Sequence, residues 1–183
     1  MPRTIILDTP KGKRTVVIPK GMRVEETSRV YVDMLLLIVQ HFMKRDGRGL
    51  IDALKTSDGT YFVLHINVVD DHVFWTVEPV LIPRRIVAGG FFQKEDGYWQ
   101  EARAAAVPHM RGRGLYKAVL RRIRAFLGHP IVSDTQLSAA NVCVWVAVGG
   151  VPEDKHNAFR INPKRNLTKS IARCILALET TPC

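Results

Sequence analysis

The sequence has little of what marks secreted, membrane-spanning or metal-binding proteins. Its three cysteines, an odd number without CxxC spacing, predict reduced thiols rather than a disulfide framework. Apolar runs such as Met34–Val39 are far shorter than the roughly 18–20 residues that cross a bilayer. The first residues carry no apolar core like that of a signal peptide, and the histidines show no metal-ligand spacing. We therefore expect a cytoplasmic protein with no membrane segment and no metal site.

Acidic residues are also scarce. Asp and Glu number 17 against 27 Lys and Arg, which gives a net charge of +10. This balance favours anionic partners such as nucleotides, nucleic acids, phosphorylated cofactors or acidic proteins, although solvated surface charges produce it equally well. At 183 residues and 46% hydrophobic, the chain is expected to fold as one domain, 1–183. Within it we distinguish an N-terminal hairpin, 1–20, and a basic C-terminal extension, 151–183.

The N-terminal part predicts a hairpin followed by two helices. Pro10 and Gly12 form a turn between the apolar runs Thr4–Leu7 and Thr15–Ile18, which are expected to pair. A long helix is predicted at Val24–Lys44 and a shorter one at Leu50–Leu54. Spacings of three and four define the buried face of the long helix as Val30, Met34, Leu37, Ile38, His41 and Phe42.

The middle of the chain predicts an antiparallel meander of four strands. Asp70-Asp71 and Asp96-Gly97 are turn signals between apolar runs rich in β-branched and aromatic residues. The strands are expected at Tyr61–Val69, His72–Val77, Ile86–Gln93 and Tyr98–Val107.

The last of these strands runs into a basic loop with two glycines, which opens a helix expected at Gly114–Leu127. Gly112 and Gly114 allow the backbone to approach a ligand closely, and the first helical turn presents free N–H groups. With Arg111 and Arg113 beside it, the loop is typical of a phosphate or pyrophosphate cradle. An ordinary strand-to-helix turn with surface arginines has the same local pattern.

A strand and a helix follow this basic helix. Pro130–Ser133 predicts a short buried strand, parallel to the strand before the loop because a helix joins the two. The next helix is expected at Ala139–Val148, capped by Ser138 or Asp134. In the tail, the candidate elements are a strand at Phe159–Ile161 and a helix, preferred over a strand, at Ile171–Leu178.

This order of elements resembles the GNAT superfamily of acetyl-CoA-dependent N-acetyltransferases. The family loop is Arg/Gln-x-x-Gly-x-Gly/Ala, and here Arg111 and Gly114 match it while Tyr116 stands at the final small position. The strand EARAAAV resembles the family's fourth strand, and PIVSD its fifth. The resemblance covers residues 86–150 and is nearest in character to acetyltransferase-like proteins of tailed phages.

A second motif carries the resemblance after the fifth strand. The family helix there reads Asn-x-x-Ala-x-x-x-Tyr-x-x-x-Gly-Phe. In this register Ser138 takes the Asn position, Trp145 the Tyr position and Gly149-Gly150 the Gly-Phe position. The family tyrosine donates a proton to the departing thiolate, whereas an indole N–H donates hydrogen bonds but is not a usable acid.

The resemblance implies an α/β (α+β) fold with a GNAT-like, mixed, mostly antiparallel central sheet flanked by helices, with a parallel splayed strand pair. It also implies acetyl-CoA as co-substrate, with its pantetheine arm beside the fourth strand and its pyrophosphate on the loop. The Val107 N–H would polarise the thioester carbonyl. The implied coenzyme A-binding residues are Ala105, Ala106, Val107, Arg111, Gly112, Arg113, Gly114, Leu115 and Tyr116.

Catalysis in this family often uses a carboxylate on the fourth strand, which makes Glu101 the candidate base. Glu101 lies six residues before Val107, so the strand period puts both on one face. The alternative is a surface glutamate paired with Arg103 or a neighbouring strand. For the leaving thiolate, Tyr116, Ser133 or Ser138 is the candidate acid; water alone is another reading, and loss of catalysis a third.

Three functions remain open at this point. The first is acetyl transfer to a primary amine on a protein, a small molecule or an aminoacyl-tRNA. The second is a catalytically inactive binding protein of the same fold that acts on a partner protein. The third is a basic nucleic-acid-binding module, whose affinity would fall steeply with salt. An oligomer is compatible with each of them.

Overall fold

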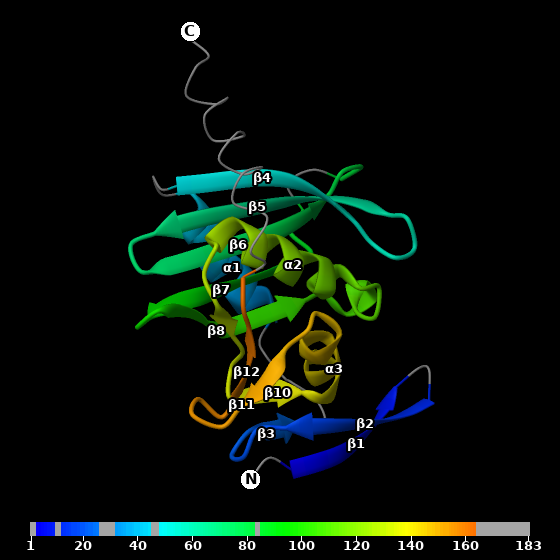
Figure 1. Cartoon of the computed structure of the whole chain (residues 1–183). Helices are drawn as coiled ribbons and strands as arrows, with labels where there is room; N and C mark the ends of the chain where they lie inside the picture. Colours follow the sequence, from blue (N-terminus) through cyan, green and yellow to red (C-terminus); the bar gives the residue numbers. More distant parts are fainter. Residues whose placement is uncertain (1–2, 10–11, 26–31, 45–47, 83–84, 164–183) are drawn as a thin grey trace, which may run out of the picture.

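The computed structural model describes residues 3–9, 12–25, 32–44, 48–82 and 85–163. An eight-stranded sheet in the order β11-β12-β9-β8-β7-β6-β5-β4 forms its centre, accompanied by the hairpin β1-β2 and the pair β10-β3 (Figure 1). The chain is therefore mixed α/β with a large, mostly antiparallel sheet, which confirms the α+β class. The strands are β1 (Arg3–Thr9), β2 (Gly12–Ile18), β3 (Arg23–Glu25), β4 (Arg48–Lys55), β5 (Tyr61–Val69), β6 (His72–Pro79), β7 (Ala88–Glu95), β8 (Tyr98–Ala106), β9 (Ile131–Val132), β10 (Gln136–Ser138), β11 (Val151–Glu153) and β12 (Ala158–Ile161). The helices are α1 (Val32–Met43), α2 (Leu115–Leu127), α3 (Ala139–Ala147) and the 3-10 turn η1 (Pro108–Met110).

The predicted meander is confirmed and is longer than expected. Strands β5 to β8 pair antiparallel in sequence order, and β4 adds a further strand along β5. The helix predicted at Leu50–Leu54 is wrong, because this segment lies within β4. Its side chains alternate: Leu54 is buried while Ile51 is 70% exposed, as a sheet edge with one covered face requires.

Helix α1 covers one face of this sheet. It packs against β6 and β7, and its buried residues are Leu35, Leu36 and Val39. The predicted face is mostly wrong: Met34, Leu37 and Ile38 are exposed and His41 lies on the surface, whereas Phe42 packs against Phe74 as predicted. The helix also begins at Val32, because Arg23–Glu25 is the strand β3; Val30 lies outside the described residues. An almost continuous apolar run offers two faces, and contact with the sheet selects one of them.

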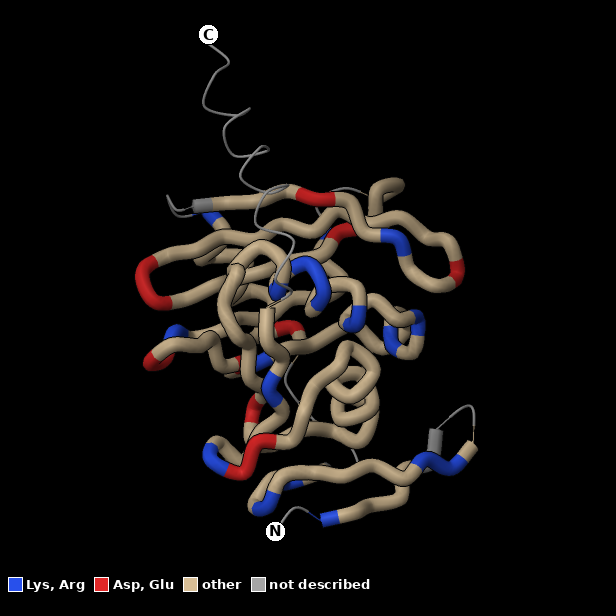
Figure 2. Tube along the Cα trace, in the orientation of Figure 1, with Lys and Arg blue, Asp and Glu red and all other residues tan. Residues whose placement is uncertain are grey.

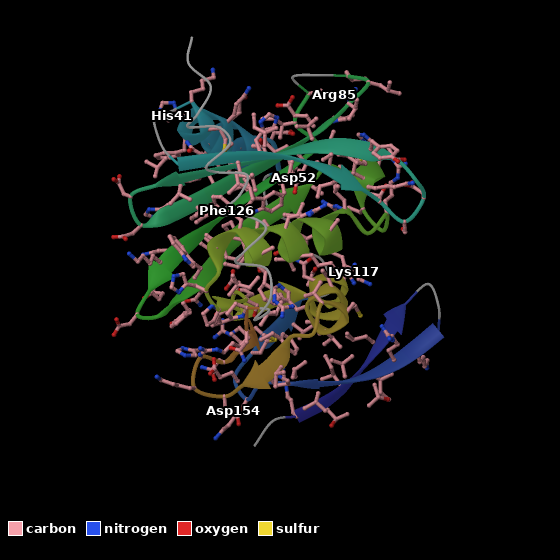
Figure 3. The ribbon with its side chains drawn as sticks, turned by 45° about the horizontal axis from the view of Figure 1, so that its top comes forward. His41, Asp52, Arg85, Lys117, Phe126 and Asp154 are labelled. Atoms are coloured by element: carbon pink, nitrogen blue, oxygen red, sulfur yellow. The ribbon has the colours of Figure 1, made fainter. Side chains whose placement is uncertain are left out.

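Helices α2 and α3 cover the opposite face. Figure 3 labels Lys117 and Phe126 along α2, with His41 of α1 on the far side of the sheet. Asp52 of β4 forms an ion pair with Arg122 of α2 at 3.2 Å, which ties the helix to the sheet edge. The two glycines that bound α2, Gly114 and Gly128, both adopt left-handed backbone conformations, so the predicted helix limits are confirmed.

The parallel crossover is also confirmed. Strand β9 lies parallel to β8, with α2 between them in the chain, and the two pair only at Trp99–Ile131 and Gln100–Val132. Beyond Gln100 the two strands part. This gap between β8 and the chain after β9 is called the splay below.

The N-terminal part of the described chain adds residues to the core, and its C-terminal part adds strands to the main sheet. The predicted hairpin is confirmed as β1-β2, and Leu7, Val16 and Ile18 from it are buried in the core beneath α3. The strand expected at Phe159–Ile161 is confirmed as β12, which lies between β9 and β11. Residues grouped with the C-terminal extension thus supply two strands of the main sheet. The helix expected at Ile171–Leu178 lies outside the described residues.

Candidate functional site

The side chain of Glu101 lies at the point where β8 and β9 part. It is only 3% exposed, and both of its carboxyl oxygens are hydrogen-bonded. The Tyr116 hydroxyl from α2 donates to Oε1, and the Trp145 indole Nε1 from α3 donates to Oε2 at 3.2 Å. The alternative of a surface glutamate paired with Arg103 is wrong. The resemblance singled out Glu101 as the base, and Tyr116 and Trp145 as departures from the family motifs. The side chains of these three residues meet at the Glu101 carboxyl.

Burial raises the pKa of Glu101 from 4.5 to about 8, and the nearby Asp134 carboxylate acts in the same direction. The hydrogen bond from Trp145 opposes this rise, because it favours the charged form. At neutral pH the carboxyl is therefore mostly protonated and releases its proton slightly above neutrality. A buried group with this pKa is suited to taking a proton from an amine.

A bulge in β8 determines which way Glu101 faces. Glu101 pairs with Phe92 and Arg103 with Phe91, so Ala102 between them is the extra residue. The bulge shifts the alternation by one residue, so the strand period alone does not relate Glu101 to Val107. Val107 lies beyond the end of β8 and packs against the same core as Tyr116 and Trp145, the two residues that bind Glu101. Ala104 and Ala106 pack in the α2-side core with Glu101, whereas Ala105 packs on the α1 side.

Tyr116 turns into the protein rather than along the helix surface. Its ring stacks on Trp75 of β6, with centroids 5.9 Å apart. Gly90 makes room for this arrangement: a Cβ there would lie 2.9 Å from Cζ2 of Trp75 and would also strike Arg103 O. The Trp75 Nε1 atom is buried and has no hydrogen-bond partner among the described residues. A ligand that binds in the splay beside β8 would therefore lie against Tyr116 and Trp145.

A cleft of about 370 Å³ lies beside the splay, and Glu101 is one of its lining residues. Strand β7 contributes Phe91, Gln93 and Glu95 to its lining. Arg103 of β8 reaches across the splay to Asp134 with an N–O distance of 3.0 Å. Gln100, Ala102 and Glu101 complete the β8 wall.

The basic loop is only partly arranged as a phosphate cradle. Gly112 and Gly114 have φ values of 76° and 77°, so both use the left-handed region that the sequence suggested. No side chain of the described residues caps the N-terminus of α2. The exposed Arg111 donates from Nε to Ala106 O at 3.2 Å, which holds its guanidinium beside the splay.

Arg113 is already engaged. Its guanidinium binds Asp58 Oδ2, at 2.7 Å from Nε, and Thr60 Oγ1 at 2.8 Å. Ser57 also donates to the Arg113 carbonyl at 3.2 Å. Hydrogen bonds from Thr56 and from Arg113 hold the pKa of Asp58 below its usual range. Arg113 therefore fastens the loop to the β4–β5 turn, and the expected role as a phosphate ligand does not fit this geometry.

The expected role of the Val107 N–H does not fit either. It donates to Val87 O at 2.9 Å, on the side of β8 that faces away from the splay. Successive residues of a strand turn their N–H groups to opposite edges. Ala106, whose carbonyl accepts from Arg111, therefore directs its N–H toward the splay, and Ala104 does the same. These alanines form the free edge along which an extended ligand arm would pair.

The two candidate serines have other partners. Ser138 caps α3, accepting from Asn141 N at 3.3 Å, which confirms it over Asp134 as the cap. Asp134 accepts instead from Gln136 N at 3.2 Å. Ser133 donates to Asp134 O and accepts from Phe159 N at 3.0 Å. Tyr116 remains the candidate acid beside Glu101. Cys143 is a free thiol, as predicted.

Two contributors were not identified from the sequence. Asp58 has no local signal, because its partner Arg113 lies 55 positions away in the sequence. For Trp75, the glycine pair Gly89-Gly90 was the available signal that an aromatic ring crosses the adjoining strand.

Within the described part of the chain, no cluster of His, Cys, Asp and Glu is suited to a metal ion. None of the described helices is long and apolar enough to cross a membrane. A comparison with protein-family models and a comparison with curated proteins each give no match.

Proposed function

We propose that this chain is an N-acetyltransferase with a GNAT-like architecture, which moves an acetyl group from acetyl-CoA to a primary amine by direct attack. The observation that carries the proposal is the buried Glu101 carboxyl, placed where two parallel strands part and beside a cleft of about 370 Å³. A general base needs a pKa near the working pH and a route for the acceptor; the pKa of Glu101 is about 8, and Glu101 is one of the residues that line the cleft.

The connections around the splay support the proposal. The resemblance implies a parallel fourth and fifth strand that separate around the pantetheine arm, and β8 and β9 are joined through α2 and separate after Gln100. Before the meander the match is weaker. Among the described residues one helix, α1, precedes β4, where the family has two helices after its first strand.

Acetyl-CoA supplies the activated acyl group. The residues of this chain bind the cofactor and transfer the protons. The uncapped N-terminus of α2 and the Arg111 guanidinium provide partial and full positive charge for the pyrophosphate. The edge of β8 at Ala104 and Ala106 offers backbone N–H groups to an extended arm. Glu101 accepts the amine proton, and the Tyr116 hydroxyl is the nearest candidate donor for the thiolate.

The same geometry also favours a second candidate function, binding without catalysis. The side chains of Tyr116 and Trp145 both converge on Glu101 at the splay, where the family has a small residue and a tyrosine. A protein that has lost turnover would keep this fold and use its surface for a partner protein.

One titration with two readouts tests the proposal. The purified protein is titrated with acetyl-CoA by calorimetry, and release of free thiol is then followed with a panel of amines. Binding together with amine-dependent thiol release supports the transferase. Binding without turnover on any amine favours the second candidate. No binding at millimolar acetyl-CoA contradicts the transferase, and RNA binding that falls steeply with salt would then favour a nucleic-acid-binding module.

A further inference from the structure

Helix α1 has apolar side chains on the side that faces solvent as well as on the side that is buried against the sheet. On the solvent side Met34 is 55% exposed, Leu37 67% and Ile38 44%, and the exposed His41 lies among them. These four residues are called the outer face of α1 below. A surface helix ordinarily turns polar residues to solvent, and a helix that is apolar all round is normally covered. The outer face of α1 therefore has the composition of a contact surface.

The charges of α1 stand at its two ends. Asp33 lies in the first turn and Lys44 directly follows the last residue, and the helix between them carries no Lys, Arg, Asp or Glu (Figure 2). Both residues are exposed, and neither forms an ion pair within the described part of the chain. Lys44 follows Asp33 by about three helical turns, so both lie along the side of the helix that carries the outer face.

This arrangement of charges is complementary to itself. When a second copy of α1 lies antiparallel across the outer face, Asp33 of each copy stands opposite Lys44 of the other, and the apolar residues between them face each other. A two-fold axis produces both ion pairs at once, because a symmetric contact uses the same surface on both copies. A helix with one charge of each sign is less suited to an anionic membrane, which attracts clusters of cations. The charges thus favour a second copy as the occupant of this face.

A hollow beside α1 gives the same face a shape that a side chain can fill. Its volume is about 170 Å³, and its lining includes Ile38 and Phe42 of α1 with Phe74 and Phe91 of the sheet. The antiparallel arrangement brings Met34 of the second copy to the Phe42 end of the helix, because Asp33 of that copy stands beside Lys44. An unbranched methionine adapts to irregular apolar gaps.

The apolar surface continues from α1 onto the edge of the sheet. Asn67 of β5 donates to Phe42 O at 3.3 Å, which places the C-terminal end of α1 beside β5. Asn67 pairs with Gly49 of β4, and Ile51, two residues farther along, points to the same face of the sheet and is 70% exposed. A contact centred on α1 can therefore extend to β4.

We propose that the outer face of α1 is the contact between two copies of this chain, which are related by a two-fold axis and place their α1 helices antiparallel, with Asp33–Lys44 ion pairs at both ends. The inference goes beyond the transferase function and does not depend on it. Tyr116 and Trp145, which hold Glu101, come from helices on the opposite side of the sheet, so the contact leaves the candidate site open.

Sedimentation equilibrium of the full chain tests the contact. Between about 1 and 100 µM the wild type should show a concentration-dependent dimer. Leu37→Glu buries two carboxylates in the symmetric contact and should raise the dissociation constant of the dimer by more than about tenfold. The matched control is Ile6→Glu on β1, where the isoleucine is 68% exposed but distant from α1, and it should stay within about twofold of the wild type.

Three results would overturn the contact. A wild type that stays monomeric up to about 100 µM, a concentration at which even a weak specific dimer is populated, contradicts it. Binding of that monomer to phosphatidylserine vesicles, if Leu37→Glu abolishes it, would assign the outer face to a membrane surface instead. A dimer that Ile6→Glu weakens as much as Leu37→Glu would place the contact elsewhere. Unchanged melting temperatures of both variants show that each is folded.

A charge exchange tests the antiparallel arrangement itself. Asp33→Lys places like charges at both ends of the contact and should raise the dissociation constant about three- to tenfold, in the range of two exposed ion pairs. Adding Lys44→Asp restores opposite charges across the contact and should recover the wild-type value to within about twofold. The double variant has unfavourable charges at both ends of its own helix, so a gain in helix stability cannot explain the recovery. Equal or greater weakening in the double variant overturns the antiparallel contact.

Discussion

The indole Nε1 of Trp145 donates to Oε2 of Glu101 at 3.2 Å and links the middle of α3 to the strand β8. The other carboxyl oxygen is held by Tyr116 from α2. One buried acid on the sheet is therefore fixed from both covering helices, and its protonation state is coupled to the packing of the whole α2 side.

Replacement of the buried acid tests its chemical role. Glu101→Gln should lower amine-dependent thiol release by about 10²–10⁴-fold, the usual contribution of a general base. Binding of acetyl-CoA, measured by calorimetry, serves as the control and should persist. Because the pKa of Glu101 is about 8 and the base acts when deprotonated, wild-type turnover should rise with pH up to about 8. Normal turnover of the variant at neutral pH would remove Glu101 from the mechanism.

The same residue makes stability depend on pH. The pKa of Glu101 is about 8 in the folded chain and ordinarily 4.5, so between these values the folded state holds a proton that the unfolded chain has released. The stabilisation is complete below pH 4.5 and is lost as pH rises to about 8, with a slope of at most about 1.4 kcal/mol per pH unit. Urea unfolding from pH 5 to 9 should show this slope in the wild type relative to Glu101→Gln. A pH-independent difference would contradict a neutral buried carboxyl.

The Tyr116 hydroxyl and the Trp145 indole can be separated by matched variants. Tyr116→Phe keeps the ring on Trp75 and leaves Glu101 Oε1 without its donor, which should cost about 1–3 kcal/mol of unfolding free energy. Trp145→Phe should cost a comparable or larger amount but retains the hydroxyl. If Tyr116 protonates the thiolate, kcat falls far more in Tyr116→Phe, with KM for acetyl-CoA unchanged. Equal kcat values would leave Tyr116 with a packing role only.

The two loop arginines should differ in what their loss affects. Arg111→Ala should weaken acetyl-CoA binding about three- to tenfold, in the range of one charge-assisted contact, and should reduce its salt dependence. Arg113→Ala breaks the contacts with Asp58 and Thr60 and should mainly lower the melting temperature. Calorimetry and thermal unfolding of both variants check this division. Stronger loss of binding in Arg113→Ala would show that it leaves Asp58 when ligand binds.

The helix cap offers a variant without chemical consequence. Ser138→Ala removes the acceptor for Asn141 N and should destabilise the protein by about 1 kcal/mol. Thiol release per folded molecule should be unchanged. A selective loss of kcat at constant melting temperature would restore Ser138 as a candidate acid.

Local patterns in the sequence were sufficient for much of the fold. Turn signals located the hairpins of the meander, and Gly114 and Gly128 bounded α2 because the left-handed backbone at its ends needs glycine. Leu50–Leu54 could not be assigned from five residues, since only the pairing with β5 shows that it is a strand. The face of α1 was equally underdetermined, because apolar residues surround that helix.

The candidate site was predictable only where it depends on residues that are close together in the sequence. Glu101 and the loop follow from their positions along the chain. The bulge at Ala102, the ion pair of Arg113 with Asp58 and the inward turn of Tyr116 each depend on segments distant in sequence. A periodicity argument cannot register an extra residue that only the partner strand reveals.

Gly90 has a consequence beyond its own strand. The absent side chain lets the Trp75 indole lie across β7, where it supports the Tyr116 ring, which in turn reaches Glu101. In a saturation library selected for function, even alanine should therefore be excluded at position 90, although Gly90 has no side chain that could take part in the reaction. A substitution at Gly90 would displace Trp75 and Tyr116 and thereby change the surroundings of Glu101. We expect it to appear as a shift in the pKa of Glu101.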